Sequence, residues 1–453
     1  MRGAWLAGLA AAKYLADAGR KATVVEKRPI LGGELSSWKD RDGDVLETGP
    51  HTFFGGDDAM RALLRDVGIS HHVLWQPHTR TYAMPPGWSD RWEGGPIFEE
   101  FRFTDAPSPF NGIGAVLNAR YVFNAIEKLL FVTGILPVLV GDDNYAERQD
   151  DISYSTWHRK RGMSEHMPCT FFAPMSLALN FTHIDDISAE AMLRVMAYFA
   201  RSKDASRAAF LDGATGDRLI EPIAAYLRGR GVAIDTAVPI AELLFAGDRC
   251  SGARTGDGRT YEANSVILAT PVHNAAKRLP TQMLRDPLVH GVVKLASSPV
   301  INAHLWFDKP ISRYSNLIFG CGSLAPVHAD LGQASPGYEW PGKSFVEICV
   351  APADDRMKLD DATIVERVLT DMQKLYPLAR ESFVESKLVR VPKSVYRARP
   401  GAERLRRGAR TPVRNLFLAG RYTNHRYPAS IEGAMRSARH AADGVLEYAG
   451  ARA

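Results

Sequence analysis

GAWLAGLAAAKYLADAGRKATVVE, residues 3–26, is the stretch that decides the fold. Its Ala- and Leu-rich residues 6–18 predict a helix, which Gly19 ends because glycine readily adopts the left-handed conformation that follows a helix. Residues 21–26 then predict a short buried strand that ends in Glu26. A helix followed by a strand with a terminal acid is the second part of a dinucleotide-binding βαβ unit, in which the acid binds a ribose hydroxyl.

The first part of this unit departs from the usual pattern. Gly3, Trp5 and Gly8 stand where the pattern G-x-G-x-x-G has its glycines. The second glycine lets a pyrophosphate approach the helix N-terminus, so the indole of Trp5 should fill space that the phosphates need. Only Met1 and Arg2 precede Gly3. We therefore expect the first strand either to be absent or to begin upstream of this chain.

Two further glycine turns follow the pattern of a nucleotide site. Gly32 and Gly33 come soon after the Glu26 strand, and adjacent glycines let a diphosphate approach the backbone closely. Residues 418–423 (LAGRYT) and then 430–434 (SIEGA) predict a strand, a glycine turn and a helix N-terminus, whose backbone N–H groups point at an anion.

The amino-acid composition limits the classes of protein to which this chain can belong. The 453 residues suffice for two or three domains, and 45% hydrophobic with 24% charged residues is typical of a folded protein. A net charge of +5 is too small to indicate nucleic acid as a partner. The four cysteines form no C-x-x-C pair, which argues against a zinc site and fits a reducing cytoplasm. We expect no metal, no signal peptide and no spanning helix.

The pattern of elements predicts a discontinuous cofactor domain. We expect residues 1–60, 217–275 and 410–453 to form a Rossmann-like α/β domain of the dinucleotide-binding type. Residues 61–216 and 276–409 then form an inserted substrate domain. Within it, residues 122–141 are the most apolar segment, although Pro137 interrupts them.

Eight stretches together resemble plant- and cyanobacterial-type phytoene desaturases, within the FAD-dependent amine oxidase family. They are AKYLADAG (12–19), GGELSSWKDRDGDVLETGPHTFFG (32–55), ALNFTHIDDIS (178–188), AFLDGATGDRLIEP (209–222), ATPV (269–272), PVINAHLWFD (299–308), PKSVYRARPG (392–401) and LAGRYTNHRYPASIEGA (418–434). The resemblance covers nearly the whole chain. It implies an FAD-binding Rossmann-like α/β domain and a substrate domain of mixed sheet and helices. It also implies oxidation of a carotenoid or other long isoprenoid polyene, with a quinone as electron acceptor.

The resemblance also assigns residues to FAD. The matching positions are Gly3, Gly8, Glu26, Arg28, Gly32, Gly33, Thr48, Gly49, Val238, Gly420, Arg421 and Glu432. Two departures argue against simple transfer: Trp5 replaces a family glycine, and Arg421 replaces a family aspartate and inverts the local charge. Pro50 also replaces an apolar residue, commonly leucine. FAD binding is therefore in question, although a guanidinium attracts a diphosphate.

Three functions stay open at this point. The first is an FAD-dependent desaturase; the second is a flavin-free isoprenoid cyclase, isomerase or hydratase on the same scaffold; the third is a lipid-binding pseudoenzyme. Arg218 matches a family arginine near the flavin and would act electrostatically, or would form a structural ion pair. Asp212, Asp185, Asp186 and Glu432 are candidates for the acid that a flavin-free enzyme would need, although a cap, a turn or a surface position explains each of them better.

Two surfaces suggest a membrane. Leu129–Val140 (LLFVTGILPVLV) predicts an apolar helix or hairpin that either enters the core or dips into a bilayer. Residues 390–414 are basic and would meet anionic headgroups or form a solvated face. We expect a cytoplasmic, peripherally membrane-associated protein. Asp40, Asp42 and Asp44 indicate a hairpin turn rather than a metal loop, because Asp-Gly favours such turns.

Overall fold

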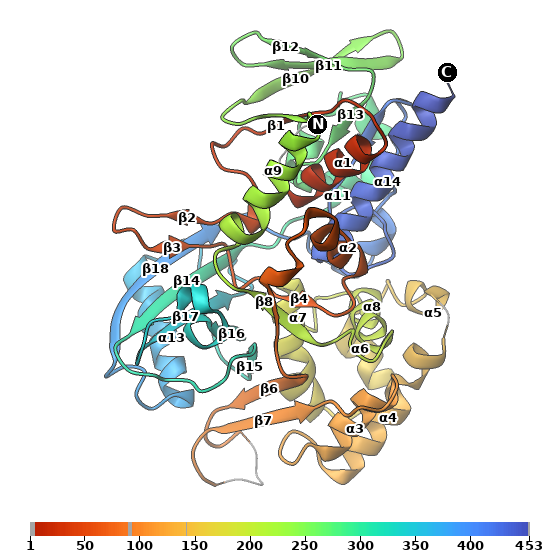
Figure 1. Ribbon diagram of the computed structural model, residues 1–453. Helices are drawn as coiled ribbons and strands as arrows, with labels where there is room; N and C mark the ends of the chain where they lie inside the picture. Colours follow the sequence, from red (N-terminus) through yellow and green to blue (C-terminus); the bar gives the residue numbers. More distant parts are fainter. Residues whose placement is uncertain (1–4, 89–92, 142, 452–453) are drawn as a thin grey trace.

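The computed structural model describes residues 5–88, 93–141 and 143–451. Both chain ends lie in the upper half of the molecule, with parallel strand pairs and the helices that pack beside them (Figure 1). A large sheet and a group of helices form the lower half. The predicted Gly3 and the start of the βαβ unit lie outside the described residues.

The upper half is built around two parallel strand pairs. β1 (Thr23–Val25) pairs with β9 (Ala233–Asp235), and β13 (Val266–Leu268) pairs with β19 (Leu416–Leu418). The predicted strands at 21–26 and 415–420 are thus confirmed, as are extended segments within 232–246 and 259–269. The helices of this half are α1 (Leu6–Asp17), α2 (Asp58–Val67), α9 (Glu221–Gly229) and α14 (Ile431–Gly450).

Alanine explains how α1 packs. Ala10, Ala11 and Ala12 of α1 are fully buried, and so are Ala438 and Ala441 of α14. Small side chains at a helix contact permit a short distance between the axes. The two helices contact each other along their lengths and share one apolar core with α2, α9 and the parallel strands. Helix α2 thus packs with α14, although most of its residues follow the predicted domain boundary at 60.

Two small antiparallel sheets extend from this half. β10 (Ile240–Ala246), β11 (Arg249–Thr255) and β12 (Thr260–Glu262) form the sheet at the top of Figure 1. β2 (Trp38–Lys39) and β3 (Val45–Leu46) form a hairpin, which confirms the predicted turn. Its three aspartates all hold the ammonium of Lys387, which lies 2.9 Å from Asp42. A lysine therefore occupies the place between them that a cation would take.

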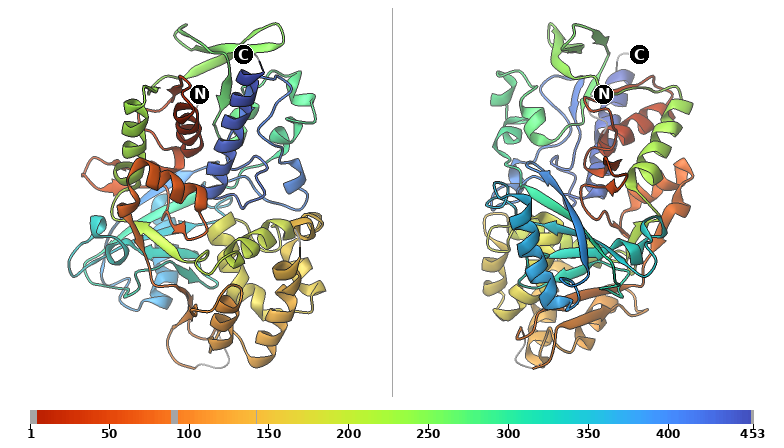
Figure 2. Two further views of the ribbon diagram at one scale, coloured as in Figure 1. Left: turned by 45° about the vertical axis from the view of Figure 1, so that its right-hand side comes forward. Right: turned by 90° about the vertical axis from the view of Figure 1, so that its left-hand side faces the viewer.

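A seven-stranded mixed sheet forms the lower half. Its strand order is β18-β14-β17-β16-β15-β6-β7, and only the β15–β6 pair among these neighbours is parallel. Its strands are β6 (Thr79–Met84), β7 (Ile97–Arg102), β14 (Val300–Phe307), β15 (Ile318–Gly320), β16 (Val327–Asp330), β17 (Ser344–Val350) and β18 (Phe383–Val391). Helix α13 (Asp361–Leu375) covers one face (Figure 2), where Ile364, Val368 and Met372 enter the core.

A group of helices completes the lower half. They are α3 (Phe110–Asn118), α4 (Ala125–Val140), α5 (Asp143–Glu147), α6 (Tyr154–Lys160), α7 (Ala173–Asn180) and α8 (Ala189–Ala200). A small sheet of β4 (Phe53–Phe54), β8 (Ala208–Leu211) and β5 (Val73–Trp75) lies between the halves. Short helices α10 (Val272–Ala276), α11 (His290–Lys294) and α12 (Leu331–Ala334) lie in connections.

Helix α4 is the apolar segment that the sequence predicted. It is a helix rather than a hairpin and begins before Leu129, at a capping box of Asn124 and Glu127. Pro137 lies inside its last turn. Among the described helices, none has the length and apolar character needed to cross a membrane.

Candidate functional site

A cavity lies where the glycine turns meet, and we call it the glycine cavity. It forms between the N-terminus of α1, the Gly32–Leu35 loop and the turn from β19 into α14. Its volume is about 740 Å³, including space open to solvent. Segments nearly a whole chain apart therefore assemble one cavity.

Polar atoms without partners line this cavity. Glu34 Oε1, His51 Nε2, Thr270 Oγ1 and the Tyr422 hydroxyl are buried and have no hydrogen-bond partner in the described structure. Trp5 is the N-cap residue of α1, and its side chain forms no capping hydrogen bond with the helix amides. Buried polar atoms and uncapped helix amides cost free energy unless a ligand or water pairs them. The cavity therefore fits a ligand rich in hydrogen-bonding groups, as a flavin dinucleotide is.

The residues predicted for the ribose end of the site lie close together. Glu26 directly follows β1, is 4% exposed and accepts a hydrogen bond from the Arg28 amide at 3.0 Å. The Val238 amide donates to the Glu26 carbonyl at 2.9 Å. The Arg28 guanidinium donates to the Gly33 carbonyl at 2.8 Å, which ties this end to the glycine loop. The structure thus brings these four residues together.

Other predicted positions surround the same loops. Gly32, Gly33, Gly49 and Gly420 all have positive φ angles (98°, 68°, 132° and 147°), which other residues rarely adopt. Thr48 donates its hydroxyl hydrogen bond to the Glu34 carbonyl. Gly8 is buried within α1, one turn from its start.

Trp5 packs directly onto the glycine loop. A Cβ atom at Gly33 would lie only 2.4 Å from the indole ring, so the contact needs glycine there. The indole also lines the glycine cavity beside the first amides of α1. The structure thus agrees with the expectation that Trp5 takes space at the helix N-terminus. It narrows the cavity without closing it.

Arg421 does not present an unpaired positive charge to the cavity, although the sequence predicts an inversion of the local charge at this position. Its guanidinium forms an ion pair with Glu34, which lies 387 residues earlier in the chain. Burial lowers the pKa of Arg421 to about 10, so it stays charged at neutral pH. Because Glu34 supplies the opposite charge, the pair is formally neutral. Only one carboxylate oxygen of Glu34 is used, and Arg421 also faces a second cavity.

The predicted catalytic residues lie elsewhere. Arg218 pairs with Asp212 at 3.1 Å, its side chain is 43% exposed, and neither residue lines the cavities described in this section. Glu432 is buried, but its carboxylate accepts from the amides of Ala59 and Met60 and so caps α2. Asp185 and Asp186 are exposed in a turn.

A second cavity, which we call the junction cavity, adjoins the first. His51, Arg421, Ser430 and Ile431 line both. Burial lowers the pKa of His51 to about 4, so its ring is neutral at pH 7. Asn302 donates to the Thr48 carbonyl at 2.7 Å, while its own Oδ1 has no partner in the described structure. Both residues stand within stretches quoted above, but nothing in the sequence singled them out.

A buried acid cluster lies behind the wall of the junction cavity. Glu47 precedes Thr48, and Glu347 lies two residues from cavity-lining Cys349 on β17. Burial and then the charge of Glu347 raise the pKa of Glu47 to about 7. Burial alone would lower the pKa of His304, but the charge of Glu347, 3.1 Å away, and the hydrogen bond to it raise that pKa. Sequence reasoning missed this cluster because its members are far apart in the chain.

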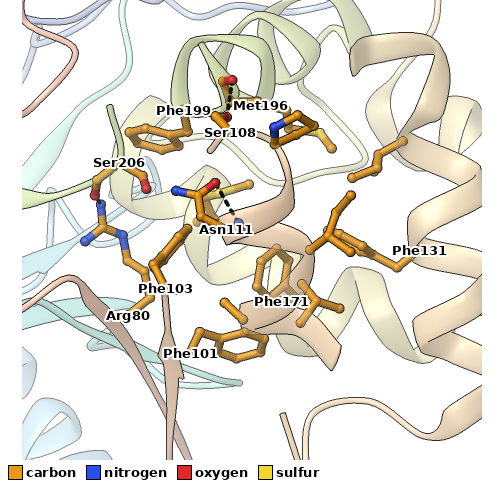
Figure 3. A pocket seen from close by; sticks show the side chains of 18 of the residues that line it. Arg80, Phe101, Phe103, Ser108, Asn111, Phe131, Phe171, Met196, Phe199 and Ser206 are labelled. Atoms are coloured by element: carbon orange, nitrogen blue, oxygen red, sulfur yellow. Dashed lines mark hydrogen bonds between the residues drawn. The ribbon is translucent and has the colours of Figure 1, made fainter. Parts of the chain in front are cut away.

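The third cavity is apolar and about 1020 Å³ in volume, open space included. It shares Phe54, Leu179 and Phe199 with the junction cavity. Aromatic rings of Phe101, Phe131 and Phe171, among others, surround one common space (Figure 3). Its other end is lined by residues of α3 and α4. This apolar cavity suits a long hydrocarbon.

Arg80 and Asn111 are two of the polar side chains in this wall, and both are satisfied (Figure 3). Arg80 donates to the Ser206 carbonyl, and Asn111 donates to the Lys203 carbonyl at 2.7 Å. Because their hydrogen bonds go to the protein, they do not call for a polar ligand.

Comparisons with known proteins agree with this geometry. The profile of the family described as flavin containing amine oxidoreductase matches residues 6–446. The chain is 36% identical to a 15-cis-phytoene desaturase of Capsicum annuum, covering 98% of this chain and 77% of the relative. It is 35% identical to the 15-cis-phytoene desaturase of Synechococcus elongatus, covering 98% and 94%. A probable zeta-carotene desaturase of that organism is 30% identical, covering 98% of both.

Solved structures share the fold at low identity. An oxidoreductase from Methanosarcina mazei superimposes with a TM-score of 0.76 at 18% identity, covering 98% of this chain and 99% of the other. Cyclohexylamine oxidase from Brevibacterium oxydans gives 0.66 at 15% identity, covering 99% and 98%. The predicted α/β fold with a mixed sheet is thus confirmed. The chain belongs to the flavin containing amine oxidoreductase family, within which it is an oxidoreductase of the phytoene desaturase type.

Proposed function

We propose that this protein oxidises a carotenoid or another long polyprenyl polyene, with FAD held in the glycine cavity. The observation that carries the proposal is the continuity of the three cavities. A polar cavity among glycine turns adjoins the junction cavity, which adjoins an apolar cavity lined by aromatic rings. The named relatives desaturate phytoene or zeta-carotene, and both are long hydrocarbons.

Named residues would hold FAD. We assign direct contacts to Gly8, Glu26, Arg28, Gly32, Gly33, Thr48, Gly49, Val238, Gly420 and Arg421. Glu432 acts indirectly, because its carboxylate is used in capping α2. When bound, FAD would supply the oxidising power by accepting a hydride. The protein's part is to align the polyene and exclude water, and the unpartnered Asn302 Oδ1 and neutral His51 face the space between the two ligands.

We propose a division into a cofactor domain and a substrate domain, supported by two core clusters. One unites α1, α2, α9 and α14 with the parallel strands, and the other packs α13 on the large sheet. A third cluster contains residues of β13 and β19 together with residues of the large sheet and so joins the two parts. We keep the predicted segments 1–60, 217–275 and 410–453 for the first domain. Its core also includes α2.

We propose that the substrate enters from a membrane. On α4, Ile126, Leu129, Leu136 and Val140 are 71%, 64%, 50% and 74% exposed, and their spacing places them on one face. The same helix lines the apolar cavity on another side. An exposed apolar face beside an apolar cavity suits a protein that lies in the interface and takes a lipid from it. A quinone from the same bilayer is our proposed electron acceptor.

One experiment separates this function from its alternatives. Purified protein is incubated with FAD, washed and examined by absorbance, then given 15-cis-phytoene in liposomes with a benzoquinone acceptor. We expect flavin bands and a product with additional conjugated double bonds. A colourless protein that rearranges the polyene without the acceptor would replace the desaturase by an isomerase or cyclase. Lipid binding with no conversion would indicate a pseudoenzyme.

A further inference from the structure

A fourth cavity, which we call the basic cavity, lies beside the C-terminal end of α4. It opens between the last turn of α4, helix α8, the 424–428 loop and α14, and encloses about 1620 Å³, open space included. Four arginines and two histidines line it: Arg194, Arg201, Arg426, Arg436, His425 and His440. None of its described lining residues is an aspartate or glutamate. No step of the proposed reaction uses this cavity.

The acids that pair with these arginines stand outside the lining. Arg194 contacts buried Glu190 at 2.8 Å and Glu147 at 3.1 Å. Arg436 contacts buried Glu432 at 2.8 Å through its Nε. A guanidinium has five N–H donors, so Arg436, paired on one side, keeps donors for a ligand on the other. Arg407, next to cavity-lining Gly408, is exposed and forms no ion pair with the described residues. The lining therefore presents N–H donors, and the carboxylates that balance its arginines lie behind it.

The loop side chains hold these donors in place. The ring of Tyr427 lies between two guanidinium groups, 3.8 Å from Arg436 and 5.4 Å from Arg201. Arg201 also bonds to the Tyr427 hydroxyl and to Asp58. Planar groups stacked in this way lose less freedom when they bind a ligand than free side chains do. Planar, fixed guanidinium forks match the oxygens of a phosphate.

The basic cavity adjoins the proposed membrane face. Pro137, Val138 and Gly141, at the end of α4, line it. Val138 also lines the apolar cavity, and Val140 is the last exposed residue of the apolar face. A lipid whose acyl chains lie along that face would carry its phosphate to the end of α4. The geometry selects an occupant with both an apolar part and a phosphate.

We propose that the basic cavity binds the phosphate of an anionic phospholipid headgroup and so orients the enzyme on the membrane from which it takes its substrate. The proposal rests on the proposed membrane association. It adds that binding depends on headgroup charge as well as on apolar insertion.

The test measures binding of the full-length protein to vesicles by co-sedimentation. Vesicles of pure phosphatidylcholine are compared with vesicles that also contain phosphatidylglycerol. The test variant carries Arg201→Gln and Arg426→Gln, both at exposed positions. The matched control carries Arg254→Gln and Arg259→Gln in the β11–β12 hairpin, which lies at the top of the molecule, away from α4 and α8 (Figure 1). Both double variants lose the same charge.

We expect the test variant to bind phosphatidylglycerol vesicles about 25-fold more weakly, at about fivefold per arginine, and phosphatidylcholine vesicles as before. The control pair should bind as the native chain does. Inorganic phosphate, at constant ionic strength, should weaken native binding to phosphatidylglycerol and leave the test variant unaffected. Equal losses in both pairs would overturn the proposal in favour of diffuse charge, and so would phosphate binding without any preference for phosphatidylglycerol.

A third variant separates this proposal from the proposed membrane association. Ile126→Asp with Leu129→Asp changes two exposed residues, so the fold should persist. It should lose binding to both kinds of vesicle. If it binds both kinds normally, the membrane face itself is wrong. If it loses binding while the Arg201 and Arg426 variant keeps its preference for phosphatidylglycerol, only the phosphate site is wrong.

Discussion

Replacing Glu47 by glutamine should stabilise the protein at pH 8 far more than at pH 5. Glu47 is 5% exposed, and burial together with the charge of Glu347 raises its pKa from 4.5 to about 7. As pH rises, the carboxyl group of the unfolded chain ionises first. The folded chain therefore loses stability from about pH 4.5 upward, and the loss is complete above the folded pKa of about 7.

The magnitude follows from the shift. A shift from 4.5 to about 7 corresponds to about 3 kcal/mol at most. Part of this free-energy difference is already present at pH 5. The advantage of the glutamine variant in free energy of unfolding should therefore grow by about 2 kcal/mol between pH 5 and pH 8. Glutamine keeps an oxygen that can accept the hydrogen bond from the Thr215 amide, which is 2.7 Å long in the native chain. The substitution thus removes the ionisation with little loss of structure.

Urea unfolding followed by tryptophan fluorescence at both pH values measures this advantage. Glu385→Gln, at an exposed position of β18 in the same sheet, controls for the loss of one acidic group. It should show the same difference from the native chain at both pH values. An equal advantage of Glu47→Gln at pH 5 and pH 8 would refute the reasoning, because Glu47 would then be ionised in the folded chain as early as in the unfolded one.

Three further outcomes are expected. Trp5→Gly should tighten FAD binding at least tenfold in a flavin fluorescence titration, because it removes the indole from the N-terminus of α1. The control Trp75→Gly, at an exposed tryptophan, should leave FAD binding unchanged. Val116→Trp should lower kcat/KM for phytoene at least tenfold at unchanged flavin content, since Val116 lines the apolar cavity and the bulkier ring fills it; unchanged kcat/KM would remove that cavity from the substrate path. Arg421→Met should lower the thermal midpoint by several degrees by leaving half-buried Glu34 without its partner, and Arg421→Met with Glu34→Gln should recover most of the loss. No recovery would mean that the pair does not couple.

Local sequence patterns predicted the elements of the fold well. An alanine-rich helix, a strand ending in an acid and a glycine turn each depend on neighbouring residues, and α1, β1 and β19 lie where such patterns place them. The apolar character of Leu129–Val140 was equally clear from the sequence, but periodicity could not distinguish a core helix from a surface helix. In the structure α4 has both properties, because it buries Phe131 and Ile135 and exposes its opposite face.

Contacts between distant segments could not be predicted from the sequence. Glu47, His304 and Glu347 are ordinary residues in three separate strands or loops, and only the pairing of β14 with β17 places His304 opposite Glu347. Arg218 shows the reverse case: a residue that matched a family position lies in an ion pair with Asp212 outside the described cavities. A linear pattern specifies which residue is present, whereas the tertiary fold decides what it contacts.

Arg421 shows why that distinction matters for the cofactor. Considered alone, an arginine in place of the family aspartate changes the local charge by two units and argues for a different ligand. In the fold, Glu34 from the glycine loop supplies the missing carboxylate within the same cavity and pairs with Arg421. The cavity therefore keeps an acidic group with one free oxygen and gains a cation beside it. Charge gives little reason to exclude FAD, and the remaining obstacle is the volume of one indole, which Trp5→Gly tests directly.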